Sequence, residues 1–203
     1  MEKINQVIEA ALEESKIPYA AYAVTNSKET LLSGSVGFTD LEKTSPLNSD
    51  AVFRIASMSK ALTSTAFMLL AQEKNLDLHS PAENYIDGLK NLQVAHLKDG
   101  QISYSKPDSK VTLHHLLTHT SGFGYDFHHE TLSHLLLEEK IASLLDKRGK
   151  FLEAPLIEQP GKFWHYGIGV GWIGKIIENL SGQSFNFGPS SNSNFKVIDV
   201  VKE

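Results

Sequence analysis

The spacing of hydrophobic positions changes several times along the chain, and each change predicts a different element. Apolar side chains recur every three to four residues from Ile4 to Leu12, which predicts an amphipathic helix that ends before Pro18. Residues 19–38 are rich in β-branched and aromatic side chains, interrupted by polar residues 26–28. This pattern predicts two strands joined by a turn, with the second strand loosened by two glycines.

Four helices are predicted after this hairpin. Residues 57–74 are small and carry little charge in their first half, so we expect a buried central helix. A second helix begins at Thr112, its expected N-cap, and stops at Gly122. The third spans 131–145 and the fourth 170–180, the latter closed by Gly182. In addition to these four, a shorter helix is expected, with Pro81 at its first position and Ser80 as its N-cap.

The last eighteen residues differ in character from the rest of the chain. Residues 186–194 are rich in Asn, Ser, Gly and Pro, which is typical of a loop or linker. Residues 195–203 are predicted to form one short strand. We therefore expect an incomplete domain over residues 1–185 followed by a divergent tail over residues 186–203.

Composition narrows the classes of function. The chain has 203 residues, 41% hydrophobic and 21% charged, which is ordinary for one globular domain. A net charge of −5 and only two arginines, Arg54 and Arg148, argue against nucleic acid or an anionic membrane as partner. The absence of cysteine excludes disulfides and thiolate chemistry. No secretory signal or run of eighteen apolar residues is present, so we expect a cytoplasmic protein without a membrane span.

Candidate chemistry begins with a serine three residues before a lysine. The spacing occurs three times, at Ser57–Lys60, Ser103–Lys106 and Ser193–Lys196. Chance alone predicts about two occurrences, so the spacing by itself is uninformative. Only Ser57 stands where an extended run passes into a long predicted helix. There the two side chains share one helix face, roughly 60° and 4.5 Å apart.

Two interpretations of this pair remain open from the residues themselves. In the first, the small, charge-poor surroundings desolvate Lys60 and lower its pKa, so that its amine accepts the Ser57 proton and makes the hydroxyl a nucleophile. In the second, Ser57 only caps the helix and Lys60 is solvated.

The nine histidines raise the question of a metal site. His115 and His119 are four residues apart on one predicted helix, which suits zinc. No carboxylate stands between them as a base. His129 and His134 are five residues apart, which turns them away from each other on a helix. We expect neither a metal nor another cofactor.

Three blocks of the chain resemble the serine β-lactamase-like family, which includes class C β-lactamases, D-alanyl-D-alanine carboxypeptidases and esterases. The blocks are FRIASMSKALTSTAFMLLAQEKNLDLHSPAENYI, VTLHHLLTHTSGF and PGKFWHYGIGVGWIGKIIENLSGQSF, in the family's order and spacing. The resemblance implies an α+β, β-lactamase/transpeptidase-like fold, with a helical region and a partial antiparallel sheet that lacks the C-terminal strands. It places the catalytic serine, lysine and tyrosine on Ser57, Lys60 and Tyr166. Without it, Tyr166 would be read as an aromatic packed beside Phe163, Trp164 and Trp172.

The activity implied is that of a serine hydrolase or acyltransferase. Ser57 would attack a small-molecule ester or amide and form an acyl-enzyme, with Lys60 and Tyr166 moving the protons. Tyr166 could act as a base only if a charged Lys60 held it as a phenolate. Ile168 stands where β-lactamases and peptidases of the family usually carry Asn. This departure favours small esters over β-lactam or peptide substrates.

A second departure is the length of the chain. The resemblance implies further strands, one with a Lys/His-x-Gly element that gives the second oxyanion donor, and no such element follows Tyr166. We therefore predict weak or no activity for the truncated chain alone. The alternatives are a catalytically dead homologue with a binding role, and a β-lactamase or D,D-peptidase. The oligomeric state is not predicted.

Overall fold

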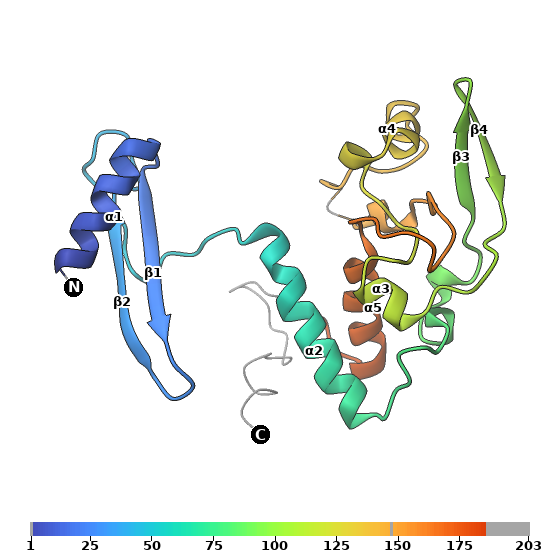
Figure 1. Cartoon of the computed structure of the whole chain (residues 1–203), viewed down its shortest axis with the longest axis horizontal. Coiled ribbons are helices and arrows are strands. Elements are labelled where there is room, and N and C mark those ends of the chain that lie inside the picture. The colour runs from blue at the N-terminus through green and yellow to red at the C-terminus, as the bar shows by residue number, and fades with distance from the viewer. Residues whose placement is uncertain (1, 147, 186–203) are drawn as a thin grey trace. The chain divides into compact units, whose positions relative to one another are not determined.

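The computed structural model describes residues 2–146 and 148–185. The chain divides into two compact units, residues 1–55 and residues 56–203 (Figure 1). The predicted boundary between a domain ending at residue 185 and a tail stays a prediction, because the tail and its expected strand lie outside the described residues. Within those residues, no helix is both long and apolar enough to cross a membrane.

The first unit is a helix followed by a hairpin, as predicted. Helix α1 spans Glu2–Ser15, and strands β1 (Tyr19–Thr25) and β2 (Thr30–Gly37) pair antiparallel. The turn forms because the side chain of Asn26 accepts hydrogen bonds from the backbone of Lys28 and Glu29. No residue of α1 is buried, and the buried hydrophobic residues described in this unit are Val36 and Leu47.

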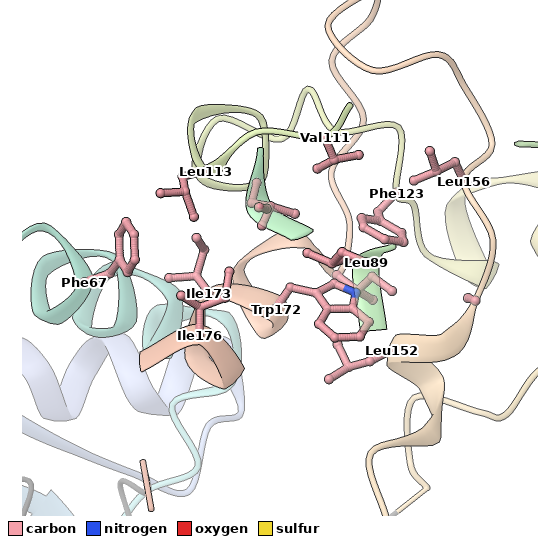
Figure 2. Packing of buried hydrophobic residues seen from close by; sticks show 14 of the residues in the cluster. Phe67, Leu89, Val111, Leu113, Phe123, Leu152, Leu156, Trp172, Ile173 and Ile176 are labelled. Atoms are coloured by element: carbon pink, nitrogen blue, oxygen red, sulfur yellow. The ribbon is translucent and has the colours of Figure 1, made fainter. Parts of the chain in front are cut away.

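The second unit is built on two helices. Helix α2 (Ser59–Glu73) packs against helix α5 (Gly169–Ser181). Figure 2 shows Phe67 on the α2 side of the core and Ile173 and Ile176 on α5, and all three are fully buried. The opposite face of α2 is open in this chain, since Leu62 and Met68 are 40% and 44% exposed. The expected buried central helix is therefore found in part, because α2 is buried along the face that packs on α5 and exposed along the other.

Two predicted helices are shorter than expected. Helix α3 spans Leu113–Leu117, with Thr112 as the predicted N-cap and His115 completing a capping box. It ends because His119 adopts a left-handed φ of 58°. Helix α4 spans Glu130–Leu137 and ends where Glu139 takes a φ of 57°, with the Lys140 amide donating back to Leu135. Both helices end at non-glycine residues with positive φ, and a helix end of this kind cannot be predicted from the sequence pattern.

A second hairpin was not predicted. Strands β3 (Val94–Lys98) and β4 (Gln101–Ser105) pair antiparallel and form a separate two-stranded sheet. They meet at Asp99-Gly100, where both residues have positive φ, as a tight two-residue turn requires. The Asp-Gly pair was a visible hairpin signal.

The short helix expected near Pro81 is a single 3₁₀ turn. It spans Ala82–Asn84, with Pro81 at the N-cap and no side-chain capping bond, so Ser80 is not the cap. The amide of Ala82 donates to the carbonyl of Val111. This long-range backbone pairing, rather than helix propensity, holds the segment.

Candidate active site

Ser57 lies in a tight turn at the entrance to α2. A single 3₁₀ turn, Ala56–Met58, precedes the helix, and Ala56 has a left-handed φ of 44°. Such a conformation is disfavoured for alanine and is often found at functional sites. The hydroxyl of Ser59 donates to the Ala56 carbonyl at 2.6 Å and stabilises the turn. The N-cap of α2 is Met58, with no side-chain capping bond, so Ser57 does not serve as the helix cap.

Lys60 lies on the same face as Ser57, one turn further along. Its Nζ donates a hydrogen bond to Ser57 Oγ over 3.2 Å. The same nitrogen lies 4.8 Å from the ring centre of Tyr166 and 5.4 Å from that of Tyr125. Contacts of this length between an ammonium group and aromatic faces are attractive. The structure thus brings together all three residues predicted for the site, while their catalytic roles stay a prediction.

Tyr166 reaches the pair from a loop more than a hundred residues away in sequence. The backbone around it is tied to His119, whose carbonyl accepts from the His165 amide at 2.9 Å and whose Nδ1 accepts from the Gly167 amide at 3.4 Å. The His119 ring lies 4.8 Å from that of Tyr166. Because these bonds flank Tyr166 on both sides, they fix where its hydroxyl points.

The charges of Lys60 and Tyr166 stabilise each other. Burial by itself would lower the pKa of Lys60, but hydrogen bonding to Tyr166 and then Tyr125 raises it above its ordinary value. Burial would raise the pKa of Tyr166, but hydrogen bonds from Ser57 and Lys60, together with the charge of Lys60, lower it. The expected fall in the Lys60 pKa is therefore wrong. The group moved toward proton acceptance is the Tyr166 phenol, beside a charged ammonium.

His119 belongs to this site and not to a metal site. It lies beyond the end of α3, so the premise that it shares a helix with His115 is wrong. Burial, and then the charge of Lys60, lower its pKa, which keeps the imidazole neutral and able to accept from Gly167. His115 is used in the capping box instead. Across residues 2–146 and 148–185, no cluster of three or more His, Cys, Asp or Glu could hold a metal ion.

Tyr125 is a member of the site that the sequence did not reveal. It is buried, its ring centre lies 5.4 Å from Lys60 Nζ, and its ring lies 5.5 Å from that of Tyr166. It follows the second block of the resemblance by two residues, but nothing in its local pattern distinguishes it from a core aromatic. Only the fold brings its ring within 5.4 Å of the Lys60 ammonium.

The remaining candidates lie elsewhere. Ser103 is on β4, so the second Ser-x-x-Lys match does not form a helix start. Ser193–Lys196 lies outside the described residues. Ile168 is buried at the start of α5 and packs in the hydrophobic core. Its side chain therefore offers nothing like the amide that an Asn would supply.

The chain is similar to known proteins over most of its length. The family model described as Beta-lactamase matches residues 4–186. Esterase EstB of Burkholderia gladioli is 29% identical over 89% of this chain and 45% of its own length. Monacolin J acid methylbutanoyltransferase of Aspergillus terreus is 34% identical over 68% of this chain and 34% of its own.

A solved structure shows the same fold. Unliganded simvastatin synthase (LovD) from Aspergillus terreus superposes with a TM-score of 0.71 and 26% identity, covering 88% of this chain and 49% of its own. The α+β, β-lactamase/transpeptidase-like fold is thereby confirmed, in partial form. The chain spans about half the length, or less, of each of these relatives.

Proposed function

Since this chain belongs to the beta-lactamase family, we propose that it carries the nucleophile-bearing part of a serine hydrolase or acyltransferase acting on small esters. An esterase and an acyltransferase are both among its relatives. One observation carries the proposal: Ser57 Oγ lies 3.2 Å from Lys60 Nζ, and the same nitrogen lies 4.8 Å from the ring centre of Tyr166.

In the first step Ser57 is the nucleophile and Tyr166 the base. The lowered pKa of Tyr166 makes its phenolate accessible, while Lys60 stays charged beside it. As Ser57 Oγ bonds to the ester carbonyl carbon, its proton passes to the Tyr166 oxygen. The tetrahedral intermediate collapses by breaking the bond to the alcohol oxygen. That oxygen takes the proton from Tyr166 and leaves as an alcohol, so the acyl group is now on Ser57.

The second step reverses these roles. Water or another alcohol gives its proton to Tyr166 and attacks the acyl carbonyl, and Ser57 regains a proton as it leaves. Water gives hydrolysis, and an alcohol gives acyl transfer. Ser57 is exposed at the start of α2, so both acceptors can reach it.

The oxyanion of the intermediate needs hydrogen-bond donors. The backbone amide of Ser57, at the positive end of α2, is one candidate. The resemblance places a second donor on a strand beyond Tyr166, whereas the strands described, β1 to β4, all precede it. Loss of one such donor typically costs about 10² to 10³ in rate. Weak or absent ester turnover by the 203-residue chain therefore stays our prediction, since turnover needs the oxyanion donors whereas labelling tests the Ser57 nucleophile alone. A catalytically dead chain with a binding role is the alternative, which an absence of label on Ser57 would favour.

An active-site probe tests the proposal. The chain is incubated with a fluorophosphonate, and the labelled peptide is mapped by mass spectrometry. We expect label on Ser57, none after Ser57→Ala, and unchanged labelling after Ser103→Ala, which removes the serine of the other described Ser-x-x-Lys match. A chain that stays folded yet takes no label, or takes it at Ser103, contradicts the proposal.

Substrate class needs a second assay. Hydrolysis of a p-nitrophenyl ester is compared with turnover of a chromogenic cephalosporin. Because Ile168 is buried in the core and gives no amide contact, we expect the ester to react in preference. Cephalosporin turnover without ester cleavage would favour the β-lactamase alternative.

A further inference from the structure

A cavity lies beside the ring of Tyr166. Its volume is about 530 Å³, within the range that holds small organic ligands. It is open on one side, and the loop after α3 and the loop before α5 form its walls. The principal lining residues are Tyr125, His128, His129, Ile157, Trp164 and Tyr166.

Besides two tyrosines, the titratable side chains that line this cavity are the imidazoles of His128, His129 and His165. None of its residues is Asp, Glu, Lys or Arg. Burial, and then the neighbouring His165, lower the pKa of His129, which favours its neutral form. The charges beyond the lining are of both signs: Glu130 and Glu158 act on His129, and the Lys60 ammonium lies on the rings of Tyr125 and Tyr166. A charged group would therefore lose its hydration here without finding an opposite charge in the lining.

Aromatic faces dominate the walls. The Tyr125 and Trp164 rings lie 5.5 Å and 6.4 Å from the ring of Tyr166. Trp164 remains 64% exposed although it lines the cavity, so much of its indole would be covered only when a ligand enters. Covering exposed aromatic surface with another ring is favourable both through the apolar area removed from water and through ring stacking.

The position of the cavity identifies which part of an ester it suits. In the proposed reaction, Tyr166 gives its proton to the departing alcohol oxygen, and later takes one from the attacking alcohol. The alcohol oxygen must then lie next to the Tyr166 hydroxyl, and a cavity bounded by the same side chain can receive the rest of that alcohol. The Tyr166 ring is itself a wall of the cavity.

We propose that this cavity binds the alcohol portion of the substrate, an uncharged apolar group that contains a ring. This inference rests on the proposed function and extends it to the class of alcohol. The same site serves the leaving alcohol in the first step and the acceptor alcohol in acyl transfer. An aliphatic alcohol of two carbons would leave most of the aromatic surface uncovered and is expected to bind poorly.

Binding is tested without catalysis, in the Ser57→Ala chain. Fluorine NMR titrations compare 4-fluorobenzyl alcohol with 2-fluoroethanol, which has the hydroxyl but no ring. We expect measurable saturation only with the ring-bearing alcohol. In the same background, Trp164→Ala should weaken its binding about tenfold, in line with the loss of one aromatic wall. Phe163→Ala is the matched control, since Phe163 is the adjacent aromatic, 61% exposed, and does not line the cavity. It should change binding less than twofold.

Acyl transfer is then measured with the unsubstituted Ser57. A p-nitrophenyl ester supplies the acyl group, and 4-fluorobenzyl alcohol or 2-fluoroethanol competes with water for it. We expect more ester product from the ring-bearing alcohol, and a loss of this preference in Trp164→Ala. Equal binding of the two alcohols, measurable but equal transfer to them, or an unchanged affinity in Trp164→Ala overturns the assignment. If neither alcohol is acylated, the binding titration alone decides it. Ring-selective binding in a chain that never labels at Ser57 instead contradicts the proposed function and upholds the ligand class of the cavity.

Discussion

Gly167 is the position where a single methyl group tests the geometry of the site. It follows Tyr166 directly, and its amide donates to His119. A Cβ built on Gly167 would lie 2.7 Å from the carbonyl carbon of Phe123 and 2.8 Å from the Cα of Gly124, and closer still to the Phe123 oxygen. These neighbours are backbone atoms, so a side-chain rotation cannot relieve the overlap.

The displacement that Gly167→Ala requires follows from these distances. Ordinary van der Waals contact begins near 3.4 Å. One of the two backbone segments must therefore move by about 0.7 Å or more, and the Tyr166 hydroxyl moves with it. A misplacement of about 1 Å can cost roughly 100-fold in rate. Overpacking of this kind also lowers the free energy of unfolding by about 1 to 3 kcal/mol.

The assay compares rates of fluorophosphonate labelling and midpoints of urea unfolding. Gly174→Ala is the matched control, because its Cβ would meet Phe185 and Thr63 at 3.6 Å and 3.9 Å, which is ordinary contact. On α5 it should leave the labelling rate unchanged and stabilise the chain by about 0.5 to 1 kcal/mol. Labelling of Gly167→Ala at the unsubstituted rate, in a chain that labels at Ser57, would show that the position of Tyr166 does not govern the reaction.

Three further predictions concern the pKa of Tyr166, the buried core residue Phe67 and the helix N-cap Thr112. The labelling rate should rise with pH as Tyr166 loses its proton, and because Lys60 lowers the pKa of Tyr166, half of the maximal rate should be reached below pH 10.0. The Lys60→Met substitution should shift this rise to higher pH. A profile of labelling rate against pH at constant ionic strength tests both expectations. Phe67→Ala should lower the free energy of unfolding by about 3 to 5 kcal/mol in urea titrations, since the ring is fully buried; a loss below about 1 kcal/mol would contradict the packing of α2 on α5. Thr112→Ala should cost about 1 kcal/mol by the same measurement, whereas Thr112→Ser, which keeps the hydroxyl, should cost much less.

The features that were predictable from sequence are local ones. The pairing of Ser57 with Lys60 follows from a three-residue spacing at a helix start, because backbone geometry alone brings such side chains to one face. The first hairpin follows from its alternation and its polar turn, and α5 follows from a 3.6-residue period closed by Gly182. In each case the interacting groups are within a few residues of one another.

The features that were mispredicted depend on partners far along the chain. The pattern after Thr112 continues as a helix would, yet the backbone turns at His119 because its carbonyl pairs with His165. This turn also removes His119 from the side of His115 and places it against Tyr166. Helix period carries no information about such a competing backbone partner.

The pKa values of the site residues likewise depend partly on near neighbours in sequence and partly on residues far along the chain. From the residues, Lys60 is a lysine among small, uncharged neighbours, and desolvation is the only effect that such a neighbourhood predicts. Burial is the largest single effect on the pKa of Lys60, but the fold adds two phenols that the sequence leaves far away. Their hydrogen-bonding and charge interactions together outweigh burial and reverse the direction of the shift. A sequence specifies which titratable groups exist and which lie within a helical turn of each other. Their pKa values, and hence which one accepts the proton, depend on distances across the folded chain, because hydrogen bonds need direct contact and Coulomb energies weaken as charges move apart.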